Sequence, residues 1–339
     1  MPVIVEEASY VASKDNPVRE RRRKEKSRSI KCDIKFVAEV EAVAKRTPLL
    51  WTMSIRACDR DTLPTLFATV SDRLIDLKLH LDSQNLDGSA LSGAIENMAG
   101  LKRLEIKNCA RKQLSVKSRA IQELKLDHNV LLEKCICPSL KRLSMYLQCP
   151  TFNPAILEPC LDSLEDLHIN FLKITHPYWL NPDSDAPNLN PCLRSLEQRI
   201  ERMPRLAKLS LFSSNYAYNW NARIMSKSVV DVTVALGNKS RLVKMACPML
   251  KTLGVNINSI TSPCLSHHFQ VIEKLTIHMD GIKSSSEADD AKIKLQLLHN
   301  TIADNMPQLK RLVYEGAYFS DVQSDQIDLK SLKIRQVLF

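Results

Sequence analysis

Residues Leu101–Cys109 read L-K-R-L-E-I-K-N-C, with aliphatic side chains at positions 1, 4 and 6 and a small polar residue at position 9. The same pattern returns at Ile121–Asn129, Leu250–Asn258 and Ile272–Asp280. In an extended segment, positions 4 and 6 point to the same side, and position 1 adds a third apolar side chain. One segment cannot bury this face alone, so the pattern predicts stacked parallel strands that share a core.

Aligning the chain on this pattern gives twelve repeats between residues 48 and 339. Pro stands two residues before position 1 in five of them, where it ends the preceding segment and directs the chain into the next strand. Position 9 carries a side chain that can form hydrogen bonds in eight of the twelve repeats. The repeats start at Leu50, Leu74, Leu101, Ile121, Leu140, Leu164, Leu206, Val229, Leu250, Ile272, Leu309 and Leu329.

These motifs resemble the leucine-rich repeat family, whose units of about 20 to 29 residues carry L-x-x-L-x-L-x-x-N/C. The resemblance implies an α/β fold, a curved horseshoe solenoid with a parallel sheet on its concave side and helices mixed with irregular segments on its convex side. Helical apolar spacing in 62–73 and 88–98 predicts convex helices. The repeats that start at Leu101 and Ile121 are too short for more than a turn or an extended piece.

Two repeats are longer than the others, and we expect insertions near 173–203 and 281–306. The first holds four prolines among Asn and Asp, a loop composition, followed by an amphipathic stretch. The second holds a run of Ser and acidic residues and then a helical apolar pattern. Each is either a tolerated surface loop or a segment that grips a partner, and Tyr178 and Trp179 are the candidate anchors in the first.

Residues 17–31 carry a net charge of +6, more than half of the net charge of +10 of the whole chain. Residues 1–29 show no apolar period, so we expect a flexible arm, and residues 17–31 hold eight Lys or Arg against two Glu. This basic run is a solvated tail, a nuclear import signal or an arm that contacts nucleic-acid phosphates. Residues 30–47 have helical spacing and would cap the first strand. The candidate arm residues are Arg19, Arg21, Arg22, Arg23, Lys24, Lys26 and Arg28.

Composition and motifs argue against several classes of protein. No apolar run is long enough to span a membrane and the N-terminus lacks a secretory signal, so we expect an intracellular protein, cytoplasmic or nuclear. Ten irregularly spaced cysteines predict thiols, not disulfides or a zinc site. No phosphate-binding or catalytic motif is present, and Cys149 or Cys160 with His168 lacks an orienting third residue. We therefore expect no enzyme activity, no cofactor and no metal.

In the family that this chain resembles, the concave face is built from positions 3, 5 and 7, which flank the aliphatic positions. Here these residues alternate in charge, with aromatic side chains near the middle of the array. Mixed charge with central aromatic residues favours a protein interface over a basic nucleic-acid face. The candidate partner-binding residues are Lys107, Arg142, Tyr146, His168, Asn170 and Phe212.

The leading interpretation is a non-enzymatic scaffold or adaptor that binds a protein partner. The last repeat ends in Val337, Leu338 and Phe339 without a polar cap, so we expect this end to dock on a partner or a second copy. One alternative is a subunit of a ribonucleoprotein assembly whose basic arm contacts phosphates. Another is a ubiquitin ligase substrate receptor, because residues 63–70 resemble the start of an F-box.

Overall fold

The chain forms two compact units, Met1–Tyr146 and Leu147–Phe339. We refer to them as the N-terminal unit and the C-terminal unit. The computed structural model describes residues 29–33, 52–56, 67, 71, 74–80, 88–107, 112–127, 130–147, 153–171, 190–213, 220–235, 240–256, 269–278, 293, 296–300, 302, 306–315 and 336–338.

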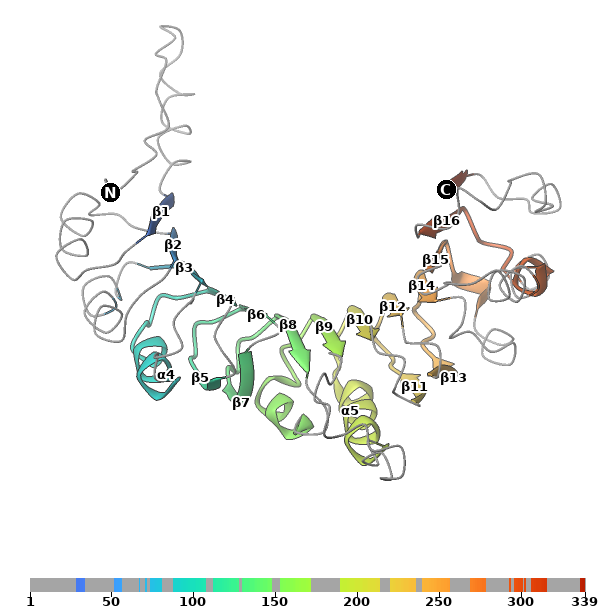
Figure 1. The fold of residues 1–339 in the computed structure, drawn as a ribbon. Coiled ribbons are helices and arrows are strands. Elements are labelled where there is room, and N and C mark those ends of the chain that lie inside the picture. The colour runs from blue at the N-terminus through green and yellow to red at the C-terminus, as the bar shows by residue number, and fades with distance from the viewer. Residues whose placement is uncertain are drawn as a thin grey trace, which may run out of the picture. The chain divides into compact units, whose positions relative to one another are not determined.

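The N-terminal unit contains a parallel sheet with the strand order β1-β2-β3-β4-β6-β8 (Figure 1). Neighbouring strands pair at equivalent positions of their repeats, so that Leu77 lies beside Leu104 and Leu104 beside Leu124. The strands are β1 (Ser29–Asp33), β2 (Thr52–Arg56), β3 (Asp76–His80), β4 (Arg103–Lys107), β6 (Glu123–Leu126) and β8 (Arg142–Leu147).

The C-terminal unit repeats this arrangement in a parallel sheet with the order β9-β10-β12-β14-β15-β16-β17. Its strands also pair in register, with Leu209 between Leu167 and Val232. The strands are β9 (Asp166–Phe171), β10 (Lys208–Ser213), β12 (Asp231–Ala235), β14 (Thr252–Asn256), β15 (Lys274–His278), β16 (Arg311–Glu315) and β17 (Gln336–Leu338).

The aliphatic positions of the repeat form the core. In the ten repeats that start from Leu74 to Leu309, all thirty residues at positions 1, 4 and 6 are buried, and none is more than 5% exposed. Tyr314 takes position 6 of the last of these repeats and is buried as well. The predicted alternation is therefore confirmed, because the side chains between these positions point to the other face of each sheet.

Entry into each strand is fixed by a shared backbone contact. The carbonyl of Ile75, at position 2, accepts hydrogen bonds from the amides of Lys102 (2.8 Å) and Arg103 (3.0 Å) in the next repeat. The carbonyl of Lys102 does the same for Gln122 and Glu123. The contact recurs in the C-terminal unit, so strands enter their sheets at a constant register and their outward side chains fall into rows.

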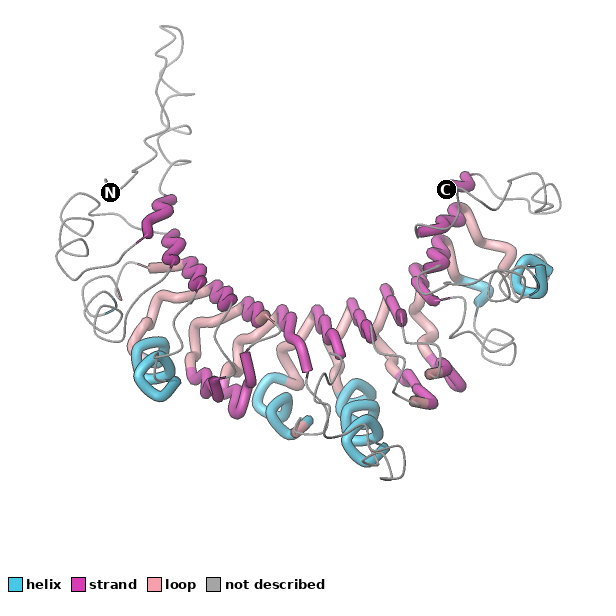
Figure 2. The backbone as a smooth tube through the Cα atoms, viewed as in Figure 1, coloured by secondary structure: helices cyan, strands magenta, loops and turns pink. Residues whose placement is uncertain are grey.

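On the other side of its sheet, the N-terminal unit carries helix α4 (Gly88–Glu96) and a two-stranded parallel sheet of β5 (Lys112–Lys117) and β7 (Val130–Ile136) (Figure 2). The helix predicted within 88–98 and the extended pieces predicted after Leu101 and Ile121 are thus confirmed. The hydroxyl of Ser92 on α4 accepts a hydrogen bond from the Ser115 amide at the edge of β5 (3.1 Å).

The C-terminal unit has the same sequence of elements. Helix α5 (Asn190–Arg202) precedes a two-stranded parallel sheet of β11 (Asn221–Met225) and β13 (Arg241–Ala246). Here Glu197 on α5 accepts from the edge amide, that of Arg223, at 2.8 Å. The 3-10 helix η1 (Pro154–Cys160) precedes α5, and the 3-10 helix η5 (Phe269–Val271) follows β13. Between successive strands of the large sheets, the chain therefore forms in turn a helix, a strand, a strand and a 3-10 helix, and then repeats this order. We call four such repeats a block.

The two blocks match in detail. The thiol of Cys137 lies 3.8 Å from the Val116 carbonyl after β7, and that of Cys247 lies 3.9 Å from the Ile224 carbonyl after β13. Both two-stranded sheets also have a register shift at the equivalent point, after Leu114 in β5 and after Ala222 in β11. Corresponding repeats in the two blocks therefore share both the buried thiol contact and the register shift.

Three expectations about the ends and insertions need correction. The helical cap predicted over residues 30–47 is wrong at its start, because Ser29–Asp33 is strand β1, paired with β2 so that Ile30 and Cys32 take positions 4 and 6. Residues 34–47 of this predicted cap lie outside the described residues. The last strand does not follow from a start at Leu329, because Gln336 pairs with Arg311, which places position 1 at Ile334. Residues 190–202 of the expected first insertion are helix α5, whose Leu196 and Ile200 belong to the core.

None of the helices in the described ranges is long and apolar enough to cross a membrane.

Candidate partner-binding face

The side chains at positions 3, 5 and 7 of the sheet strands form a face that we call the open face of each unit. Along β4, Arg103, Glu105 and Lys107 alternate with the buried Leu104 and Ile106. In both units the helices and two-stranded sheets lie on the opposite side (Figure 1). The open face therefore displays side chains that the core does not require.

Position 3 of the N-terminal unit is a row of alternating charges. Arg103 pairs with Asp76 on the neighbouring strand at 2.9 Å, and Arg142 pairs with Glu123. Each pair joins residues that face one another in the sheet register. Opposite charges at such cross-strand positions attract, so within each pair the two charges compensate each other.

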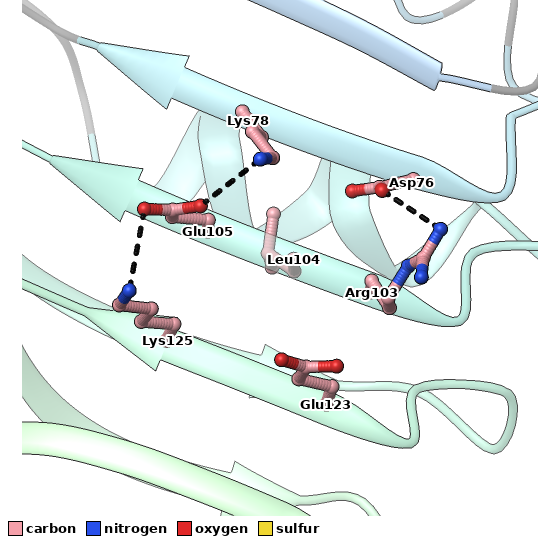
Figure 3. Close-up of a pocket in the computed structure, with 7 residues that line it drawn as sticks. All are labelled: Asp76, Lys78, Arg103, Leu104, Glu105, Glu123 and Lys125. Atoms are coloured by element: carbon pink, nitrogen blue, oxygen red, sulfur yellow. Dashed lines mark ion pairs between the residues drawn. The ribbon is translucent and has the colours of Figure 1, made fainter.

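Position 5 of the same unit places one carboxylate among three lysines. Glu105 lies between Lys78 on β3 and Lys125 on β6, with oxygen to nitrogen distances of 3.7 and 3.8 Å (Figure 3). Lys107, two residues along the same strand, lies 2.9 Å from Glu105. The three ammonium groups thus share a single carboxylate, and we call these four residues the lysine cluster.

The lysine cluster keeps Glu105 ionised. Partial burial of the Glu105 side chain acts to raise its pKa, but the hydrogen bond from Lys107 and the charges of Lys107, Lys125 and Lys78 outweigh burial and lower the pKa below its usual range. The same hydrogen bond raises the pKa of Lys107, with smaller contributions from Asp127 and Tyr146.

A shallow depression of about 270 Å³ lies at the lysine cluster. Leu104 contributes to its lining, and the remaining lining residues are all charged (Figure 3). They are Asp76, Lys78, Arg103, Glu105, Glu123 and Lys125. The depression is therefore a site for charged groups, not for an apolar ligand.

A larger depression of about 720 Å³ lies on the opposite side of the N-terminal unit, between α4 and the sheet of β5 and β7. Small residues of α4, including Ser89 and Gly93, form one wall, and no atom lies within 4 Å of the place where a Cβ of Gly93 would stand. In the C-terminal unit, Trp220 lies beside the corresponding helix, and its indole donates a hydrogen bond to Glu197 (3.0 Å).

The open face of the C-terminal unit has a different composition. Position 5 carries no Asp, Glu, Lys or Arg from β9 to β16. Its side chains are short or only weakly polar, and several are largely buried between their neighbours. The row consists of His168, Ser210, Thr233, Gly254, Thr276 and Val313.

Three predicted residues come together at the start of this row. The rings of His168 and Phe212 are 5.1 Å apart at an interplanar angle of 34°. Asn170 is the register partner of Phe212 on the neighbouring strand. Aromatic pairs in tilted contact gain stability beyond their buried area, so this group forms a preorganised patch of aromatic and amide side chains on the open face.

Gly254 lies within this row, between Thr233 and Thr276. A Cβ at Gly254 would lie 3.1 Å from the Thr233 side chain and 3.3 Å from Nε2 of His278. The other ring nitrogen of His278 lies 3.3 Å from the Glu315 carboxylate. Glycine at this position lets the neighbouring side chains close over the strand.

The structure places the predicted residues in two groups. Lys107, Arg142 and Tyr146 lie on the open face of the N-terminal unit, and His168, Asn170 and Phe212 lie on that of the C-terminal unit. Val337 and Leu338 lie in β17, beside β16. The predicted anchors Tyr178 and Trp179, the arm residues from Arg19 to Arg28, and Phe339 lie outside the described residues.

Sequence reasoning missed the lysine cluster as a unit. The signal was present, because Lys78, Glu105 and Lys125 stand at position 5 of three repeats in succession, and strands in register bring such residues side by side. The enclosed Gly254 was also missed. Its position within a strand was the available hint, since glycine there often marks a close approach by neighbours.

Of the side chains considered for catalysis, Cys160 and His168 have different neighbours, and Cys149 lies outside the described residues. Cys160 is buried, and its thiol lies 3.2 Å from the Leu157 carbonyl within η1. His168 instead packs against Phe212 on the open face. Within the ranges that the structure describes, no group of three or more His, Cys, Asp or Glu side chains is placed to hold a metal ion.

Comparison with known proteins found no family model that matches the chain and no similar curated protein.

Proposed function

We propose that this protein is a leucine-rich repeat solenoid that acts as a non-enzymatic scaffold or adaptor and binds a protein partner through its open face. The observation that carries the proposal is the division of each strand between two tasks. Side chains at positions 1, 4 and 6 are buried in the core, whereas positions 3, 5 and 7 place mainly polar, charged and aromatic side chains on the open face of a regular backbone. Such a surface presents binding residues without cost to the fold.

The chemistry of the displayed residues supports a protein partner. The aromatic residues Tyr146 and Phe212 are half-buried on the open face, which leaves ring surface available for contact. Tyr and other aromatic residues are favoured anchors at protein interfaces. Both signs of charge stand in the N-terminal rows, whereas a nucleic-acid surface is one-sided and basic.

Site-specific photocrosslinking tests this proposal. A photoreactive amino acid is introduced at Phe212, at Tyr146 or, as a control away from the open face, at Met249, which is 54% exposed. We expect protein adducts from a lysate of the source cells at the first two positions and none at Met249. Adducts at Met249 alone would move the interface off the open face.

Alanine variants provide the second arm of this test. Tyr146→Ala and Phe212→Ala should reduce adduct formation from the other labelled position or weaken capture of the partner, with little change in the urea midpoint of unfolding. The side chains contribute to the open face and not to the core, so their loss leaves the packing intact. Unchanged capture by both variants would place the interface in other parts of the chain.

The basic arm is tested separately. The full chain and a chain that begins at residue 29 are compared on an immobilised single-stranded RNA at increasing salt. Retention that depends on the arm and falls steeply with salt would support the ribonucleoprotein alternative. Equal, weak retention of both chains would favour the protein-binding scaffold.

A further inference from the structure

We infer that the lysine cluster of the N-terminal unit is a docking point for an acidic side chain, Asp or Glu, of the protein partner. This inference rests on the proposed function and names the chemistry of one contact within it. The argument starts from charge. Lys78, Lys107 and Lys125 approach the single carboxylate of Glu105 at 3.7, 2.9 and 3.8 Å.

The positive charge of this cluster lies outward. The lysine side chains are 52%, 49% and 57% exposed, whereas Glu105 between them is 17% exposed. A group that approaches from solvent therefore meets ammonium groups before it meets the carboxylate. Asp127 offsets part of the charge of Lys107, but among the described residues Lys78 and Lys125 form ion pairs with Glu105 alone. An incoming carboxylate completes the balance of charge.

The neighbouring rows decide between an acidic side chain and a polyanion. Asp76 and Glu123 border the same depression, each paired with an arginine. A phosphate backbone crossing the face would have to pass over these carboxylates, and like charges in close contact are unfavourable. The depression of about 270 Å³ is instead suited to a single carboxylate from a segment of mixed charge.

Substitution of Glu105 separates docking from a structural role. In Glu105→Gln the three ammonium groups lose their internal partner, so an acidic ligand should bind more tightly. If the cluster only stabilises the sheet, Glu105→Gln should lower the stability of the fold and should not raise the affinity for an acidic ligand. The variant in which Lys78 and Lys125 are both replaced by Gln removes the outward charge and should weaken binding.

The experiment uses the full chain and a labelled peptide of alternating Glu and Ser, followed by fluorescence anisotropy. The comparison probes are a peptide of alternating Gln and Ser and a single-stranded oligonucleotide of equal length. We expect binding of the Glu peptide that weakens about three- to ten-fold in the double Lys→Gln variant and tightens by a similar factor in Glu105→Gln. Lys134→Gln, on β7 at the opposite side of the unit, should leave binding unchanged.

Two outcomes would overturn the inference. One is no gain in affinity for the Glu peptide in Glu105→Gln while the variant unfolds at the same urea concentration as the unmodified chain. The other is tighter binding of the oligonucleotide that depends on the same lysines. If the open-face adducts at Phe212 and Tyr146 persist in either case, the scaffold proposal stands. If those adducts are absent from the unmodified chain, the scaffold proposal itself fails.

Discussion

The two open faces share a backbone and differ in chemistry. Position 5 of the N-terminal unit holds Lys78, Glu105 and Lys125, whereas position 5 of the C-terminal unit runs through Ser210, Thr233, Gly254 and Thr276. The strands that carry these residues pair in the same parallel register and bury the same three positions. The difference teaches that the core keeps positions 1, 4 and 6 alike in both units, whereas position 5 differs between them. Position 5 forms a row of charges in one unit and a row without Asp, Glu, Lys or Arg in the other.

The largest effect should be common to both units, because it concerns their cores. Leu104→Ala and Leu209→Ala each remove a side chain that is 1% or 0% exposed, and each should lower the free energy of unfolding by about 2 to 5 kcal/mol. Urea denaturation followed by circular dichroism measures both. A cost below about 1 kcal/mol for either variant would mean that its sheet does not pack as described.

A smaller effect should appear only in the C-terminal unit. Gly254→Ala places a Cβ 3.1 Å from Thr233 and 3.3 Å from His278, and such overpacking costs about 1 to 3 kcal/mol. Thr233→Ala in the same chain removes the closer neighbour and should recover much of this loss. Ser210→Ala, in the same row, serves as the control. A neutral Gly254→Ala variant would show that the neighbouring side chains move apart freely.

A third effect depends on pH and arises in the C-terminal unit. His299 and Tyr314 are buried and hydrogen-bonded to each other, and Nδ1 of His299 has no partner among the described residues. Burial lowers the pKa of His299 below its ordinary value of 6.5. As the pH falls below 6.5, His299 takes up a proton in the unfolded chain before it does so in the folded chain. The contribution of neutral His299 to stability is therefore fully present above pH 6.5 and is lost as the pH falls toward the folded-state pKa.

Urea midpoints measured above and below pH 6.5 check this prediction. His299→Gln removes the titrating group and should flatten the dependence in that window, whatever its effect on stability at neutral pH. An equal pH dependence in the unmodified chain and His299→Gln would assign the titration to other groups.

The smallest effect should come from the paired charges of the N-terminal face. The Arg103 side chain is 52% exposed in its pair with Asp76, and exposed ion pairs contribute at most about 1 kcal/mol. A double-mutant cycle with Arg103→Ala and Asp76→Ala should give a coupling energy below that value, and added salt should reduce it further. A much larger coupling would make the charged row a structural element and not a display surface.

The repeats in the middle of the chain could be predicted from sequence because each has three aliphatic residues at fixed spacing. The ends could not. Leu329, Leu332 and Ile334 fit the 1-4-6 pattern, but Ile334, Val337 and Phe339 fit it as well if Phe is allowed, and the register of β17 agrees with the second set. At the other end, Ser27 stands where position 1 of β1 would lie, so the aliphatic pattern is incomplete and the helical spacing from residue 34 dominated the prediction.

The candidate face was predicted in outline but not in its contacts. Sequence spacing placed His168, Asn170 and Phe212 on one face, and the structure brings them together. The spacing cannot show which charges pair, because Arg103 has acidic residues on both neighbouring strands, and in the structure it pairs with Asp76. It likewise cannot show that three lysines converge on Glu105.

The block of four repeats has a consequence for how this architecture tolerates change in length. Each described block brings its own helix, and that helix supplies the acceptor that covers the edge amide of its own two-stranded sheet, Ser92 for Ser115 and Glu197 for Arg223. Removing the repeat that carries the helix would separate the edge amide from its acceptor and leave a polar group without that partner. Gain or loss of a whole block keeps every such pair together, so we expect this architecture to change in length by four repeats and not by one.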